Sequence, residues 1–98
     1  MDLLIKGGTV VTATSSFKAD VAVKNGKISA IGANLKPEKK TEVVDAKGKM
    51  ILPGVIDGHT HLAMPFGGTV ATDDYFTGTR AAACGGTTTV FDFVLQGV

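Results

Sequence analysis

Short hydrophobic runs alternate with polar residues through the first half of the chain and end at turn-forming residues. A period of two is typical of β-strands that each bury one face. The runs predict strands at residues 3–5, 9–12, 20–24, 27–31, 42–44 and 49–52. Asn25-Gly26 adopts positive φ angles at little cost and predicts a two-residue hairpin turn, and Lys47-Gly48 predicts a second tight turn. We therefore interpret residues 1–52 as a small antiparallel β module.

The pattern changes after Pro53. The β-branched residues Val55 and Ile56 predict a short buried strand, and a loop that contains Gly and Pro is expected at residues 64–71. Residues 87–94 are rich in Thr, Val and Phe, so they predict a second buried strand.

A helix is predicted between the loop and the second strand. Thr72 offers a capping hydroxyl, and Asp73 and Asp74 follow where the helix dipole favours negative charge. Gly85-Gly86 is expected to end the helix, because a glycine at this position can adopt the left-handed conformation. The order strand, loop, helix, strand is one βαβ unit of a parallel sheet, so residues 53–98 are interpreted as α/β.

Composition and charge exclude several kinds of partner. The net charge is +1, from ten basic and nine acidic residues, and gives no electrostatic reason to expect nucleic acid or an anionic membrane as a partner. No apolar run has the length needed to cross a bilayer. Cys84 is the only cysteine and cannot form an internal disulfide, which is consistent with a reducing, cytoplasmic environment.

The only two histidines, His59 and His61, lie one residue apart at the end of the first predicted strand of this half. Residues i and i+2 of a strand project to the same side, so both imidazoles could bind one divalent ion. The spacing alone is equally compatible with two hydrogen-bonded core histidines. Their position at the C-terminal end of a parallel strand, where sites of α/β barrels are built, favours the metal. Asp57 would either orient a ligand or accept backbone hydrogen bonds near the strand end.

These residues also carry a resemblance to a known family. Residues 53–61 read Pro-Gly-Val-Ile-Asp-Gly-His-Thr-His and resemble the first-strand signature of the amidohydrolase superfamily. Residues 64–69, Met-Pro-Phe-Gly-Gly-Thr, together with Asp73-Asp74 and residues 85–88, resemble the D-hydantoinase/dihydropyrimidinase branch. The similarity extends along the whole chain, and residues 64–69 are the more selective part, because dihydroorotases and allantoinases usually place a Pro-Gly pair in that loop.

The resemblance implies an α/β fold: the start of a (β/α)₈ TIM-type metal-dependent hydrolase barrel, preceded by part of a small β-sandwich domain. Residues 1–52 would be the N-terminal part of a composite β-sandwich, and residues 53–98 the first βαβ unit of the barrel. The full fold needs several hundred residues, so the chain is expected to be an N-terminal fragment of a longer protein.

The implied activity is zinc-dependent opening of cyclic amides or ureides, such as hydantoins or 5,6-dihydropyrimidines, to N-carbamoyl amino acids. His59 and His61 would hold one of two zinc ions, and a carboxylated lysine later in the protein would bridge both ions. No lysine follows Lys49 in this chain, and the general base is also expected further along. The 98 residues alone are therefore expected to be inactive. The family resemblance further implies a homotetramer or homodimer.

Two points of the resemblance leave alternatives open. Met64 and Phe66 would form part of a gate around the exocyclic group of the substrate, or would simply pack the rim of the barrel. A non-enzymatic dihydropyrimidinase-like assembly protein, an allantoinase or a dihydroorotase are the alternative functions. The intact histidine pair favours an enzyme, and the absence of a positive charge in the loop disfavours substrates that carry a carboxylate. Asp92, inside the second strand, is expected to have a structural hydrogen-bonding role.

Overall fold

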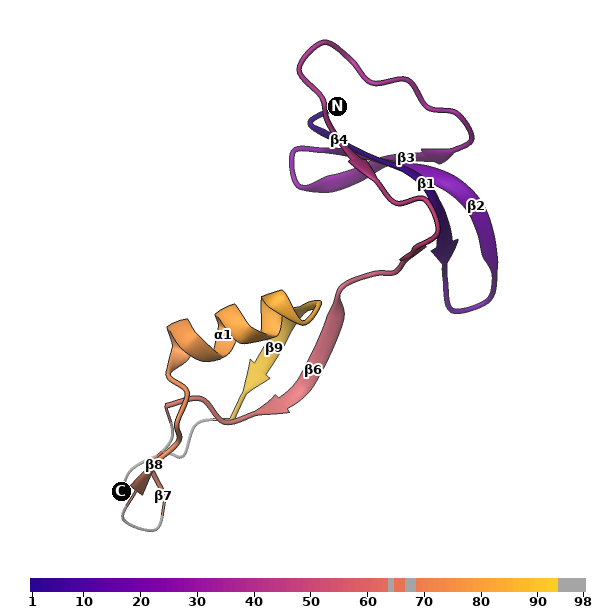
Figure 1. Ribbon diagram of the computed structural model, residues 1–98. Helices are drawn as coiled ribbons and strands as arrows, with labels where there is room; N and C mark the ends of the chain where they lie inside the picture. The colour runs from indigo at the N-terminus through magenta and orange to yellow at the C-terminus, as the bar shows by residue number, and fades with distance from the viewer. Residues whose placement is uncertain (64, 67–68, 94–98) are drawn as a thin grey trace. The chain divides into compact units, whose positions relative to one another are not determined.

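The structure, a computed structural model, describes residues 1–63, 65–66 and 69–93 (Figure 1). The chain divides into two compact units, Met1–Pro53 and Gly54–Val98, and each is described by itself. Within the described residues, no helix is long and apolar enough to cross a membrane.

Residues 1–53, all of which are described, form a five-stranded sheet (Figure 1). Its strands are β1 (Leu3–Val11), β2 (Ser16–Lys24), β3 (Lys27–Gly32), β4 (Glu42–Asp45) and β5 (Met50–Ile51). The order is β3-β2-β1-β4, and β5 also pairs with β1. The β1–β2 and β2–β3 pairs are antiparallel, but β4 and β5 run parallel to β1.

The prediction of an antiparallel module is therefore wrong for β4 and β5, and the sheet is mixed. Hydrophobic alternation defines the faces of a strand but not its direction. The direction is set here by the connection after β3, which returns the chain to the start of β1. The Thr41 hydroxyl donates to the carbonyl of Met1 at 3.0 Å, and the Glu42 N–H donates to the carbonyl of Asp2 at 3.0 Å.

Both predicted turns are present. Asn25 and Gly26 have φ angles of 52° and 73°, as a two-residue hairpin of the expected type requires. Gly48 has a φ of 76°, and the Lys49 N–H donates to the Ala46 carbonyl at 2.9 Å to close the second turn. These turns are local events that a dipeptide can specify.

The two strands predicted at residues 3–5 and 9–12 form a single strand, β1, that is continuous through a β-bulge. Ile5 pairs with Val21, but Gly8 pairs with Ala19, so β1 carries one extra residue at this point. Gly7 has a φ of 77°, which a residue with a side chain adopts only with strain. The glycine therefore continues the strand through a bulge instead of ending it.

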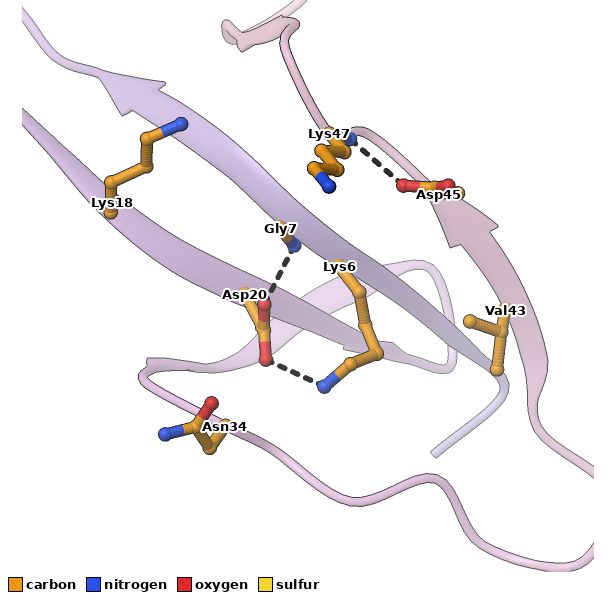
Figure 2. A pocket seen from close by; sticks show the side chains of 8 residues that line it. All are labelled: Lys6, Gly7, Lys18, Asp20, Asn34, Val43, Asp45 and Lys47. Atoms are coloured by element: carbon orange, nitrogen blue, oxygen red, sulfur yellow. Dashed lines mark hydrogen bonds and ion pairs between the residues drawn. The ribbon is translucent and has the colours of Figure 1, made fainter.

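Buried Asp20 links three segments of this unit (Figure 2). Its Oδ1 accepts the Gly7 N–H at 2.9 Å, and its Oδ2 accepts Lys6 Nζ at 2.9 Å and the Leu35 N–H at 3.0 Å. The Gly7 N–H and then the Lys6 ammonium hold the pKa of this carboxyl below its ordinary value. The carboxylate thus provides an acceptor for the N–H of Gly7 at the bulge. The side chains of Lys6 and Asp20 border a pocket of about 560 Å³, none of whose lining residues is histidine (Figure 2).

Burial is uneven across the sheet. Leu4, Val10, Val21 and Ala22 are buried, but Ile28 in β3 is 65% exposed. The prediction that every strand buries one face is therefore wrong for β3 and β4, neither of which has a buried residue. Among the described elements, β3 contacts only β2. Alternation reports which residues could be buried, whereas burial itself requires a second layer.

The second unit contains the predicted βαβ arrangement (Figure 1). Its elements are β6 (Val55–Thr60), β7 (Pro65–Phe66), β8 (Thr69–Val70), α1 (Tyr75–Cys84) and β9 (Thr87–Asp92). Strands β6 and β9 pair in parallel, and α1 connects them and contacts β9. Strands β7 and β8 form a short antiparallel pair within the segment predicted as a loop.

The N-cap of helix α1 lies two residues after the predicted one. Asp74 is the N-cap: its carboxylate accepts the Thr77 N–H at 2.7 Å, while the Thr77 hydroxyl accepts the Asp74 N–H at 3.1 Å. The prediction that Thr72 caps the helix is wrong, because this reciprocal pair needs a partner three residues on. The predicted glycine end is confirmed: Gly85 caps the helix, and Gly86, with a φ of 94°, is the left-handed residue.

The strands of the second unit are exposed, contrary to the prediction that both are buried. Val55, Ile56, Phe91 and Phe93 are 57%, 64%, 56% and 50% exposed. A two-stranded sheet with one short helix has too few layers to cover both of its faces. Val94, the end of the predicted second strand, lies outside the described residues.

Candidate metal centre

His59 lies near the end of β6 and His61 directly follows the strand, and their rings lie on the same side. The two Nε2 atoms are 3.0 Å apart, and the ring planes meet at 77°. Both side chains are exposed. The spacing of two residues thus brings the imidazoles together, as the sequence predicts.

A bulge in β6 lies at the first of these histidines. Asp57 pairs with Val90 and Thr60 pairs with Asp92, so β6 spends three residue steps where β9 spends two. Bulges bend a strand and re-aim its side chains, and they recur beside active sites. The histidine pair therefore begins at a local irregularity of the β6–β9 pairing.

The hydrogen bond of His61 to Phe93, the residue after β9, fixes which of its nitrogens is free. Its Nδ1 lies 2.9 Å from the backbone carbonyl oxygen of Phe93. A carbonyl only accepts hydrogen bonds, so Nδ1 carries the proton and the lone pair of the neutral ring is on Nε2. Nε2 is also the atom that faces His59. His61 therefore presents a metal-binding lone pair toward its neighbour.

The donor pair fits a divalent ion. In a neutral pair the Nε2–H of His59 donates to Nε2 of His61, and a metal ion would take the place of that proton. Two nitrogens bound to one tetrahedral zinc ion are about 3.3 Å apart, close to the 3.0 Å found here. Among the described residues, no group of three or more His, Cys, Asp or Glu side chains could hold a metal ion. His59 and His61 would supply two ligands of such a site, and further ligands would have to come from outside the described residues.

Phe93 contacts both histidines. Its carbonyl bonds His61, and its ring stacks on the His59 ring with centroids 4.3 Å apart and planes inclined by 22°. Sequence reasoning treated this residue only as part of an apolar strand. The parallel pairing of two consecutive strands could have identified it, because their carboxyl ends lie at one edge of the sheet.

Asp57 contacts the backbone of the ligand strand. Its Oδ1 accepts the N–H of His59 at 3.1 Å. Among the described hydrogen bonds, its carboxylate makes none with either imidazole. Of the two roles predicted for Asp57, the structure contains the hydrogen bond to the backbone.

Asp92 has the hydrogen-bonding role expected of it. Its Oδ1 accepts the N–H of Leu62 at 2.9 Å, and its Oδ2 accepts the hydroxyl of Tyr75 at 2.8 Å. The Leu62 N–H and then the Tyr75 hydroxyl lower the pKa of Asp92, and the same hydrogen bond raises the pKa of Tyr75. Sequence reasoning missed both partners, since neither is near Asp92 in the chain.

The side chains of the two predicted gate residues, Met64 and Phe66, lie outside the part of the chain that the structure describes. Met64 lies outside the described residues, and only the backbone of Phe66 is described, in β7. The gate thus stays a prediction.

Comparisons with known proteins agree with this picture. The family model described as "Amidohydrolase family" matches residues 50–97, and the one described as "Urease alpha-subunit, N-terminal domain" matches residues 1–57. The D-hydantoinase of Geobacillus stearothermophilus is 58% identical over 97% of this chain and 20% of its own length. The dihydropyrimidinase of Dictyostelium discoideum is 53% identical over 95% of this chain and 18% of its own length.

A solved structure gives the same result. The crystal structure of the dihydropyrimidinase from Brevibacillus agri matches with a TM-score of 0.91 and 54% identity, over 99% of this chain and 21% of that one. The chain belongs to the amidohydrolase superfamily, in its D-hydantoinase/dihydropyrimidinase branch. It spans about a fifth of the length of the relatives that it matches.

Proposed function

We propose that the intact protein is a metal-dependent cyclic amidohydrolase that opens hydantoin and 5,6-dihydropyrimidine rings to N-carbamoyl amino acids. The observation that carries the proposal is the convergence of Nε2 of His59 and Nε2 of His61 at 3.0 Å. The names of the relatives support the reaction, since they are D-hydantoinases and dihydropyrimidinases. Residues 53–98 would be the first βαβ unit of a (β/α)₈ barrel, and residues 1–52 part of a β-sandwich.

His59 and His61 would hold one of two zinc ions. When bound, the metal would polarise the ring carbonyl and lower the pKa of water. The chain's own residues prepare the ligand atoms: Phe93 keeps the Nδ1 proton of His61 in place, and its ring limits rotation of His59. Asp57 holds the backbone of the strand at His59. Ligands fixed in this way bind a metal without first ordering a loop.

The reaction itself is balanced by one water molecule. Its hydroxyl group adds to the ring carbonyl carbon, the carbon–nitrogen bond breaks, and the ring nitrogen takes the remaining proton. The base that moves this proton and the bridging carboxylated lysine would come from residues beyond this chain. We further propose that the intact protein is a cytoplasmic homo-oligomer. Its partner would be a small-molecule substrate, with no nucleic-acid or membrane partner.

Substrate preference is proposed from the segment after the histidine pair. Met64, Pro65 and Phe66 are apolar, and this segment offers no cation to pair with a carboxylate. Desolvating a charged substituent beside it would cost free energy without compensation. We therefore expect hydantoins and dihydropyrimidines to be accepted and dihydroorotate, which carries a carboxylate, to be a poor substrate. Allantoin is also expected to be a poor substrate, because allantoinases usually place a Pro-Gly pair in this loop. The intact histidine pair favours this enzyme over a non-enzymatic assembly protein.

Turnover measurements on one preparation of the intact protein test the proposal. Hydantoin, dihydrouracil, dihydroorotate and allantoin are compared before and after treatment with a chelator, and again after zinc is restored. Ring opening of the first two that is lost with the metal and regained with zinc is the expected result. Preference for dihydroorotate would contradict the substrate assignment, and full activity after metal removal would contradict the proposed function.

A further inference from the structure

The two peptide groups on either side of His61 are both bound to the end of β9. The Phe93 N–H donates to the carbonyl of Thr60 at 2.9 Å, and the N–H of Leu62 donates to Oδ1 of Asp92 at 2.9 Å. The imidazole itself is held by the Phe93 carbonyl. The first peptide group precedes the Cα of His61 and the second follows it. The orientation of this residue is therefore fixed at three points by two consecutive residues.

Only one of these three contacts depends on a side chain of the partner residues Asp92 and Phe93. The Asp92 carboxylate holds Leu62, and its other oxygen is in turn held by the Tyr75 hydroxyl at 2.8 Å. Tyr75 is the first residue of α1, directly after the helix cap Asp74. Because both of its oxygens are engaged, the carboxylate cannot rotate without losing a charge-assisted hydrogen bond. Helix α1 thus braces the carboxylate that holds the chain after His61.

The segment that follows is bound to the same helix end. The N–H of Ala63 donates to the carbonyl of Asp73 at 2.8 Å, and Ala63 has a φ of 51°. The backbone turns sharply at Ala63, three residues after β6 ends at Thr60, and a residue other than glycine adopts such a φ only where its surroundings enforce it. The Asp92–Leu62 hydrogen bond lies directly before this turn.

We propose that Asp92, braced by Tyr75, is a positioning residue for the metal ligand His61 that sets the direction in which Nε2 of His61 faces the metal. The proposal rests on the proposed function, because it assumes that His61 binds the metal. Among the described contacts Asp92 makes no hydrogen bond to either imidazole, so its hydrogen bond acts on His61 through the backbone at Leu62. Removing a hydrogen-bond partner that orients a ligand typically weakens metal binding about 10- to 100-fold.

Three variants and a matched control separate this role from simple structural support. Asp92→Ala removes the contact to Leu62, and Tyr75→Phe removes only the brace. Asp92→Asn keeps a carbonyl oxygen for the Leu62 N–H and an amide that can donate to the Tyr75 oxygen. Asp73→Ala also removes one carboxylate, but that side chain makes no hydrogen bond to the ligand strand among the described contacts, and its backbone carbonyl remains.

The measurements are made on the intact protein. The Kd for zinc is obtained by competition with a chelator, and the visible spectrum of the cobalt-substituted protein reports the coordination of the ion. Circular dichroism and thermal unfolding show whether each variant is folded. We expect Asp92→Ala to raise the Kd about 10- to 100-fold and to change the cobalt spectrum. Asp92→Asn should recover most of this loss and remain within about threefold of wild type, because its hydrogen bonds are neutral but present.

The outcomes distinguish the two levels of the proposal. If His61→Ala retains zinc, the proposed function fails. If His61→Ala loses zinc but Asp92→Ala has the Kd and cobalt spectrum of Asp73→Ala, only the positioning role is overturned. A folded Asp92→Asn variant that is as weak as Asp92→Ala would also overturn it. Should Asp92→Ala not fold, Tyr75→Phe decides: a raised Kd supports the proposal, and a Kd equal to wild type contradicts it.

Discussion

The carbonyl oxygen of Phe93 lies 2.9 Å from Nδ1 of His61, and this contact determines the chemistry that the histidine offers. With the proton held on Nδ1, the lone pair of the neutral ring is on Nε2, which faces His59. Phe93, 32 positions later in the chain, thus fixes the tautomer of His61. The H-x-H motif supplies the two imidazoles, and the pairing within the βαβ unit orients the ring of His61.

The ring of Phe93 is expected to contribute to metal affinity separately from its carbonyl. Phe93→Ala keeps the backbone carbonyl but removes the ring that stacks on His59. Such stacking contributes about 0.5–1.5 kcal/mol, so the Kd for zinc should rise by less than about tenfold. Phe91→Ala is the control, because its ring stacks on neither histidine among the described contacts and is similarly exposed. Equal zinc affinities of the two variants in chelator competition would contradict the role of the ring.

Gly54 should be intolerant of a side chain. A Cβ at this position would collide with the side chain of Thr88 at the start of the β6–β9 pairing. Gly54→Ala should therefore lower the free energy of unfolding of the intact protein by about 1–3 kcal/mol. Gly58→Ala is the matched control, since a Cβ there would meet no atom within 4 Å, and its effect should stay within about 0.5 kcal/mol.

A second substitution tests the cause of that loss. Thr88→Ala removes the atoms that the new Cβ would meet first, so the double variant should be more stable than the sum of the two single changes implies. Urea unfolding of the four proteins gives the coupling. If the effects of Gly54→Ala and Thr88→Ala on the free energy of unfolding are strictly additive, the collision with the Thr88 side chain is not the cause of the lost stability.

Asp20 should make the stability of the first unit depend on acid pH. Its pKa is lowered in the folded state by the Gly7 N–H and then by Lys6. A group with a lowered folded-state pKa stabilises the protein fully above its ordinary value, about 4, and loses this contribution as the pH falls through the lowered value. Asp20→Asn should therefore be less stable at neutral pH and show a shallower loss of stability below about pH 4.

The control for Asp20 is Asp45→Asn. Asp45 is exposed, and its carboxylate accepts the Lys47 N–H at 2.9 Å without an ion pair among the described contacts. Thermal unfolding midpoints are compared from neutral to acid pH for wild type and both variants. An Asp20→Asn variant with the same pH dependence as wild type would contradict the account.

Local features of the fold were predictable from the sequence because they depend on neighbouring residues. Asn25-Gly26 specifies its hairpin and Gly85-Gly86 ends its helix whatever the rest of the chain does. The direction of β4 was not predictable, because it depends on where a long connection returns the chain. The sequence prediction placed the helix cap at Thr72 because it considered only the first polar residues of the segment. The residue that decides the cap is Thr77, which forms the reciprocal pair with Asp74.

The candidate site divides in the same way. The positions of His59 and His61 and the side on which they lie follow from the period of a strand. Their partners do not, because Phe93 and Asp92 reach His61 and Leu62 through the register of β6 against β9. Tyr75 in α1 bonds Asp92 and not the histidine segment itself. That register contains two irregularities, so counting residues along two ideal strands would have paired the wrong positions. Burial was overestimated for the same strands, since it depends on layers that alternation does not specify.

The zinc content of the intact protein with His59→Ala or His61→Ala tests the central claim most directly. The account predicts that each variant loses most of its bound zinc and nearly all ring-opening activity, because removing one ligand leaves the site under-coordinated. The control is Thr60→Ser, at the position between the two histidines. It keeps the hydroxyl that donates to the Phe91 carbonyl, so this variant should retain both its zinc and its activity. Metal analysis that finds full zinc occupancy in both alanine variants would contradict the assignment of His59 and His61 as ligands.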